Sequence, residues 1–259
     1  MKILIGARLL SLSSTRVIFL LSVIVLLGTI FVARPAAANR QDDVLVLKQD
    51  SIGLGMGVVI KFGPDYIEAD SRTTGLKLLS RGPLWEVFLL RPSRKVYFSL
   101  PYKEVCKRSS LLGVSGATAP SASFKLPAQH TETRQHGQTF FEYKFPGETF
   151  VGNYLNDSVK DTMVVQYFLL RTLQAKVPEQ ESVIAAKLHG LPITKGIPYS
   201  LLYFKKNQPP DGSIVGRSLT ATKADKPDFS IIGKFTRTNK LEQVLNGDSS
   251  NQVIDELFN

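Results

Sequence analysis

The sequence predicts a mainly β domain built around an antiparallel sheet. From Asp43 onward, short runs rich in Val, Ile, Leu, Tyr and Phe alternate with segments that contain Gly, Pro and Asp. The runs have the length of strands, and the segments between them have the length of tight turns. In the first part of this region no helical pattern separates one run from the next. Because parallel strands need long crossover connections, neighbouring runs are expected to pair as antiparallel hairpins.

The first part of the domain is a series of such runs. Turn residues separate them, as in Gly63-Pro64-Asp65 and Arg81-Gly82-Pro83. Residues 51–57 carry three glycines and are expected to form a flexible corner between two strands. The predicted strands are Val44–Lys48, Met56–Phe62, Tyr66–Ala69, Leu76–Leu79, Trp85–Leu90 and Val96–Leu100.

The composition changes between Leu111 and Gln138, where Ser, Ala, Gly, Thr and Pro replace most large apolar residues. This composition predicts a long loop or flap. Strand-like runs resume after it, and a short helix is expected at Asn251–Phe258. The later predicted strands are Thr139–Phe145, Thr149–Leu155, Met163–Leu170, Tyr199–Lys205, Ser213–Thr222 and Phe229–Phe235.

One helix is well defined in this part of the sequence, at Pro178–His189. Proline suits the first turn, two glutamates follow near the positive end, and a glycine stops the helix. Val183, Ile184 and Leu188 give it one apolar stripe, which predicts packing on the sheet. His189 falls in the last turn, where a partial positive charge suits the helix dipole, so a structural role is expected.

The first 38 residues predict export. Basic residues precede an uncharged apolar run at residues 17–33, and the segment ends in Ala36-Ala37-Ala38. The run is either a secretory signal peptide removed after Ala38 or an N-terminal membrane anchor. Both alternatives place residues 39–259 outside the cytoplasm, in the periplasm or the extracellular space, because the positive head stays inside. Residues 39–259 are long enough for a single exported β-rich domain.

The predicted exported part is basic. The chain carries a net charge of +10, and the four basic residues of residues 1–38 leave +6 on residues 39–259. The charges are scattered, and export removes the usual nucleic-acid target, so no nucleic-acid binding is expected. Anionic lipid headgroups or cell-wall polymers suit such a surface better. Cys106 is the only cysteine and is expected to be a small apolar residue in or near a strand end.

The sequence shows no catalytic or metal-binding pattern. His130 and His136 flank Glu132, but their spacing matches no compact zinc site. Gly53-Leu54-Gly55-Met56-Gly57 resembles the start of a dinucleotide loop, yet a strand rather than a helix is expected after it. No metal and no cofactor are therefore predicted, and the protein is expected not to be an enzyme. An envelope hydrolase whose catalytic residues are distant in sequence is the alternative.

Two stretches resemble a known family. Residues 76–88 have the pattern of a strand, a turn with a proline, and a strand that contains tryptophan. The second stretch has three parts. A strand pattern at residues 164–167 is followed by a helix that begins with proline at Val177-Pro178, and then by a turn bounded by prolines at residues 188–198. These patterns resemble exported bacterial proteins with a domain of unknown function that are related to periplasmic lipoprotein carriers of the LolA-like fold.

The resemblance implies a strongly curved, half-barrel-like antiparallel sheet. One or two helices and a long loop would cover its concave side, and an apolar ligand such as an acyl chain would be held there. Apolar residues on both faces of the predicted strands agree with a sheet that lines a cavity or is covered on both sides. The residues expected to line the ligand site are Trp85, Val87, Leu89, Val165 and Tyr167.

The predicted function is that of an extracytoplasmic, non-enzymatic binding protein for lipid or another apolar ligand. The alternative is a cell-envelope interaction module with a filled core. In that case an envelope protein or an anionic polymer would dock on the basic surface or on a sheet edge. The sequence leaves both functions open.

Overall fold

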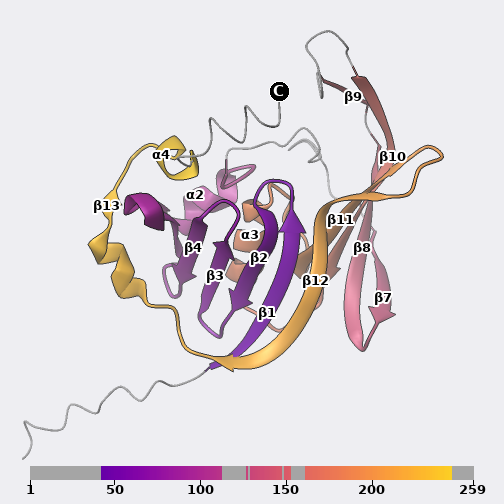
Figure 1. Cartoon of the computed structure of the whole chain (residues 1–259). Coiled ribbons are helices and arrows are strands. Elements are labelled where there is room, and N and C mark those ends of the chain that lie inside the picture. The colour runs from indigo at the N-terminus through magenta and orange to yellow at the C-terminus, as the bar shows by residue number, and fades with distance from the viewer. Residues whose placement is uncertain (1–41, 113–126, 128, 148, 153–160, 247–259) are drawn as a thin grey trace, which may run out of the picture. The chain divides into compact units, whose positions relative to one another are not determined.

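The computed structural model describes residues 42–112, 127, 129–147, 149–152 and 161–246 (Figure 1). The predicted leader, the C-terminal helix expected at Asn251–Phe258 and most of the predicted loop lie outside these residues. All described residues belong to one compact unit, Gln41–Asn259.

The first half of the sheet is an antiparallel meander, as the sequence predicts. Each strand pairs with the next through a tight turn, because the connections are too short for any other arrangement. The turn at Gly63 needs glycine, since a Cβ atom there would overlap the ring of Tyr66. The strands are β1 (Asp42–Ser51), β2 (Gly55–Phe62), β3 (Tyr66–Ser71), β4 (Leu76–Arg81), β5 (Glu86–Arg91) and β6 (Val96–Leu100).

The second half of the sheet joins the first through one long strand pair. β12 returns to β1 and pairs with it from Asp42↔Ala224 to Ser51↔Ile214. The sheet order is β13-β6-β5-β4-β3-β2-β1-β12-β11-β10-β8-β7, and β9 pairs with β10. The remaining strands are β7 (Thr131–Gln135), β8 (Gln138–Pro146), β9 (Thr149–Gly152), β10 (Asp161–Leu173), β11 (Ile197–Lys205), β12 (Asp211–Ala224) and β13 (Thr236–Arg237).

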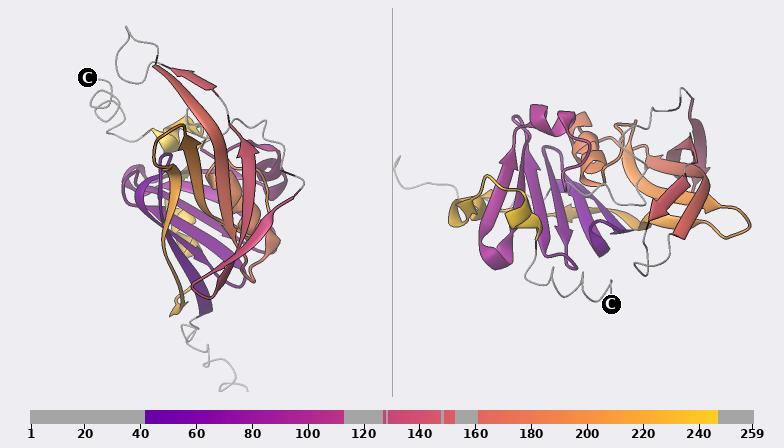
Figure 2. Two further views of the ribbon diagram at one scale, coloured as in Figure 1. Left: turned by 90° about the vertical axis from the view of Figure 1, so that its right-hand side faces the viewer. Right: turned by 90° about the horizontal axis from the view of Figure 1, so that it is seen from above.

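The sheet is open, mainly antiparallel and strongly curved, which confirms the predicted fold class. Figures 1 and 2 show β12 bending as it passes from β11 to β1. Register shifts interrupt the pairing at Lys48/Gln49 in β1, at Arg171/Thr172 in β10 and at Leu201/Leu202 in β11. Such bulges bend a strand and increase its twist, so they account for part of the curvature.

Helix α3 (Glu179–Leu188) fills the inner side of the curved sheet, next to α2 (Tyr102–Lys107) (Figure 2). The helix packs on the sheet as expected, but the prediction that only one stripe of the helix is buried is wrong. Every residue from Val183 to Leu188 is buried. Ile184 and Ala185 belong to the core cluster of the first half of the sheet, and Ala186 belongs to the cluster of the second half. Ala185 and Ala186 are each 1% exposed, so α3 contributes buried residues to both clusters.

The structure corrects three local predictions. The expected strand Phe229–Phe235 is a 3-10 helix, η2 (Phe229–Lys234), because the Asp228 carboxylate accepts a hydrogen bond from the backbone N–H of Ser230 at 2.9 Å and starts a helical turn. The predicted loop contains β7, which forms a hairpin with β8. Cys106 lies in the last turn of α2, which the sequence did not predict. Two further short helices are η1 (Pro92–Arg94) and α4 (Glu242–Leu245).

Candidate functional site

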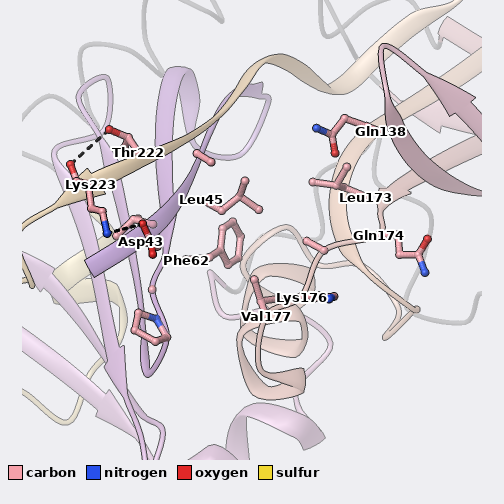
Figure 3. Close-up of a pocket in the computed structure, with 15 residues that line it drawn as sticks. Asp43, Leu45, Phe62, Gln138, Leu173, Gln174, Lys176, Val177, Thr222 and Lys223 are labelled. Carbon is pink, nitrogen blue, oxygen red and sulfur yellow. Dashed lines mark hydrogen bonds and ion pairs between the residues drawn. The ribbon is translucent and has the colours of Figure 1, made fainter. Parts of the chain in front are cut away.

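A cavity of about 660 Å³ lies between β1, β2, the end of β12 and the linker from β10 to α3 (Figure 3). This linker, residues 174–178, leads directly from the last residue of β10 into the first turn of α3. The backbone N–H of Gln174 donates to the carbonyl of Thr139 at 2.9 Å and holds the start of the linker on β8. We call this space the apolar cavity, for the side chains that form its floor.

The floor of the apolar cavity is built from apolar side chains of both halves of the sheet. Leu45 and Phe62 pair across β1 and β2, so their side chains lie on the same face. Leu173 at the end of β10 and Val177 in the linker face them across the cavity (Figure 3). Phe62 and Leu173 are each 1% exposed, so the floor is continuous with the core below it.

The rim of the apolar cavity is polar. Asp43 and Lys223 are opposite each other in the β1–β12 pairing, and their side chains form an ion pair of 2.8 Å at the cavity edge (Figure 3). Gln138, Gln174 and Lys176 are exposed on the other side. An exposed ion pair contributes little to stability, so these groups are free to exchange partners with a bound molecule. An apolar floor with a polar rim fits an amphiphile whose polar end faces water.

The C-terminal end of α3 is joined to β1 by a partly buried hydrogen-bond network. The Gln49 side-chain amide donates to the carbonyl of Pro198 at 2.8 Å, and its oxygen lies 3.0 Å from Nε2 of His189. Nδ1 of His189 lies 3.3 Å from the Ser51 hydroxyl. Burial lowers the pKa of His189 to about 4. The imidazole is therefore neutral at pH 7, and the expected partial positive charge at the helix end is wrong, although the structural role is consistent with the network.

Glu181, in the first turn of α3, is an unusual buried acid. Its side chain is 0% exposed, and no donor lies within hydrogen-bond distance of either carboxyl oxygen in the described structure. Desolvation, together with the negative charge of Asp65, raises the pKa of Glu181 to about 9. The carboxyl group is therefore protonated at neutral pH, which removes the larger cost of a buried charge.

The residues expected to line a ligand site lie elsewhere. Trp85, Val87 and Leu89 belong to the core cluster of the first half of the sheet, and Val165 belongs to that of the second half. Tyr167 stacks on Phe204, with ring centroids 4.2 Å apart. None of the five lines the apolar cavity.

Sequence reasoning missed the residues that do line the apolar cavity. Leu45 and Phe62 fall in predicted strands, but no local signal distinguishes them from other apolar strand residues. Their position at a cavity depends on the linker that follows Leu173, more than a hundred residues later. The change from strand to helix at Val177-Pro178 is the one signal that marks this linker in the sequence.

The two histidines that flank Glu132 have separate surroundings in the described structure. The ring of His130 packs edge-on against Phe141, with centroids 5.0 Å apart, and His136 occupies the turn between β7 and β8 with a φ of 49°. Among the described residues, no group of three or more His, Cys, Asp and Glu side chains is placed to hold a metal ion.

Comparison with known proteins gives no match: no family model fits the sequence, and no curated protein is significantly similar to it. Within the described ranges, no helix has the length and apolar character needed to span a membrane.

Proposed function

We propose that the protein is an extracytoplasmic binding protein that holds the apolar part of a lipid or another amphiphile in the apolar cavity. The observation that carries this proposal is the cavity itself, about 660 Å³ with an apolar floor and a polar rim. Its volume falls within the range of about 300–1,000 Å³ that is typical of small-molecule sites. The predicted leader supports a location outside the cytoplasm.

The arrangement of the cavity supports binding rather than catalysis. Its floor offers the apolar side chains of Leu45, Phe62, Leu173 and Val177, which favour burial of an apolar group but carry out no chemistry. The charged groups Asp43 and Lys223 are already paired with each other, and both are exposed. They suit contact with a polar head at the opening.

The proposal is tested by native mass spectrometry of the protein purified gently, without detergent, from its host. We expect a bound mass that organic extraction removes and that is identified as a lipid. The variant Val177→Trp should weaken or lose this binding, because the indole occupies part of the space that the apolar group would take. The matched control is Val164→Trp, which places the same side chain at a residue that is 54% exposed on β10, outside the cavity. Wild-type protein that is always bare, and that binds no added fatty acid, would refute the proposal.

One observation favours the alternative function, an envelope interaction module. The sheet order ends at β7, and most of the side chains of this strand are exposed. A sheet edge of this kind can pair with an extended segment of another protein. This function predicts a protein partner that co-purifies with the wild type and is lost in Arg134→Pro, which removes a donor from the open edge of β7, while bound lipid is unaffected by that substitution.

A further inference from the structure

A second cavity, of about 650 Å³, meets the apolar cavity at the linker between β10 and α3. Ala175 and Val177 line both cavities, so the two cavities are neighbours at these two residues. The rest of the second cavity comes from Pro127 and His130, which precede β7, from β8, from the first turn of α3 and from residues 193–196. We call it the polar cavity.

The polar cavity differs from its neighbour in chemistry. Tyr143, Ser182 and Thr194 contribute hydroxyl-bearing side chains to its wall, and His130 contributes an imidazole. The Tyr143 hydroxyl accepts a hydrogen bond from the backbone N–H of Lys195 at 3.2 Å, so its own hydrogen remains for another acceptor. Tyr143 is only 4% exposed, so this group is held in place by packing.

The charges of the polar cavity balance each other. Glu179 and Lys195 both line it, and they supply one group of each sign. A head group with a net charge would be attracted by one of them and repelled by the other. Groups that both donate and accept hydrogen bonds, such as hydroxyls and imidazole, match the hydroxyls of a sugar or a glycerol. The ring of His130 lies 5.4 Å from that of Tyr143 and presents an aromatic surface beside these groups.

We infer that the two cavities are the two halves of one site for an amphiphile with an uncharged, hydroxyl-rich head. The chain occupies the apolar cavity, the head occupies the polar cavity, and the bond between them passes Ala175 and Val177. This inference rests on the proposed function and adds the chemical class of the head group. It assigns His130, Tyr143 and Ser182 to recognition of the head.

The test compares three probes that share a ten-carbon chain: decyl glucoside, decanoate and decylphosphocholine. Each is titrated below its critical micelle concentration into the purified protein by isothermal calorimetry. We expect decyl glucoside to bind about tenfold more tightly than the other two probes. A difference of this size corresponds to two or three additional neutral hydrogen bonds. Tyr143→Phe and Ser182→Ala should each weaken glucoside binding by about threefold to tenfold, since each removes one hydrogen-bonding group.

The controls separate the head from the chain. Both variants should leave decanoate affinity within about twofold of the wild type, because the apolar floor is unchanged. Tyr203→Phe, a tyrosine of β11 that lines neither cavity, should not change the affinity for any probe. Failure of all three probes to bind refutes the proposed function. Equal affinity for the three heads, or equal losses for glucoside and decanoate in the variants, refutes only the assignment of the polar cavity.

Discussion

Replacing Glu181 with glutamine should stabilise the protein at neutral and alkaline pH. The carboxyl group is buried without a described hydrogen-bond donor, and its pKa in the folded protein is about 9, against 4.5 for an ordinary glutamate. The folded protein therefore retains a proton that the unfolded chain has released. This contribution to stability is fully present below pH 4.5 and is lost as the pH rises towards 9.

The size of this effect follows from the two pKa values. Each pH unit between them removes about 1.4 kcal/mol of stability, so about 3 kcal/mol is lost by pH 7. A glutamine has nearly the shape of the protonated acid and carries no proton to lose. The free energy of unfolding of Glu181→Gln should therefore exceed that of the wild type by an amount that grows with pH.

Urea denaturation at pH 6.5, 7.5 and 8.5 measures this difference. The matched control is Glu179→Gln, the same substitution two residues earlier in the same helix turn, where the side chain is exposed. If Glu181→Gln showed the same slope of stability against pH as the wild type, the carboxyl group would be ionised in the fold. The reasoning from burial would then be wrong.

Two further predictions concern charge in the fold. The pKa of His189 is about 4 in the folded protein and 6.5 in an unfolded chain, so its stabilising effect is complete above pH 6.5 and is lost as the pH falls towards 4. In this pH range the contribution of Glu181 to the free energy of unfolding changes in the opposite direction, so the test uses a Glu181→Gln background. Urea denaturation should show a loss of stability with falling pH in Glu181→Gln and no such loss in Glu181→Gln/His189→Gln. The same pH dependence in both variants would contradict the neutral imidazole. Desolvation of Glu68 is outweighed by hydrogen bonds from Lys77 at 2.5 Å and Lys61 at 2.9 Å, which lower the pKa of this carboxyl. Glu68→Gln leaves two partly buried lysines without a counter-charge, so it should lower the thermal midpoint of unfolding at pH 7. It should also reduce the further loss of stability below pH 4.5. An unchanged midpoint would show that the network contributes nothing to stability.

The sequence by itself determined the strands and their antiparallel order in the first half of the domain. These features are local: an apolar run sets a strand, and a turn such as that at Gly63 sets its pairing with the next strand. The helix at α3 could also be predicted, because proline, two glutamates and a glycine mark its ends. The strand predicted at Phe229–Phe235 was wrong. The apolar composition of this segment suits a strand, but the cap from Asp228 favours a helical turn.

Only the tertiary structure decided where the apolar cavity lies. The apolar cavity needs β12 beside β1, although Lys223 and Asp43 are far apart in the sequence, and it needs the β10–α3 linker opposite Phe62. The hydrogen-bond network of His189 likewise depends on the tertiary structure, since its partner Gln49 is 140 residues away in the sequence. Apolar patterning shows that a side chain is buried, but it does not show whether its neighbours fill the space or leave a cavity. Trp85 and Val87 belong to the core cluster and do not line the apolar cavity, while Leu45 and Val177 line it although they are far apart in the sequence.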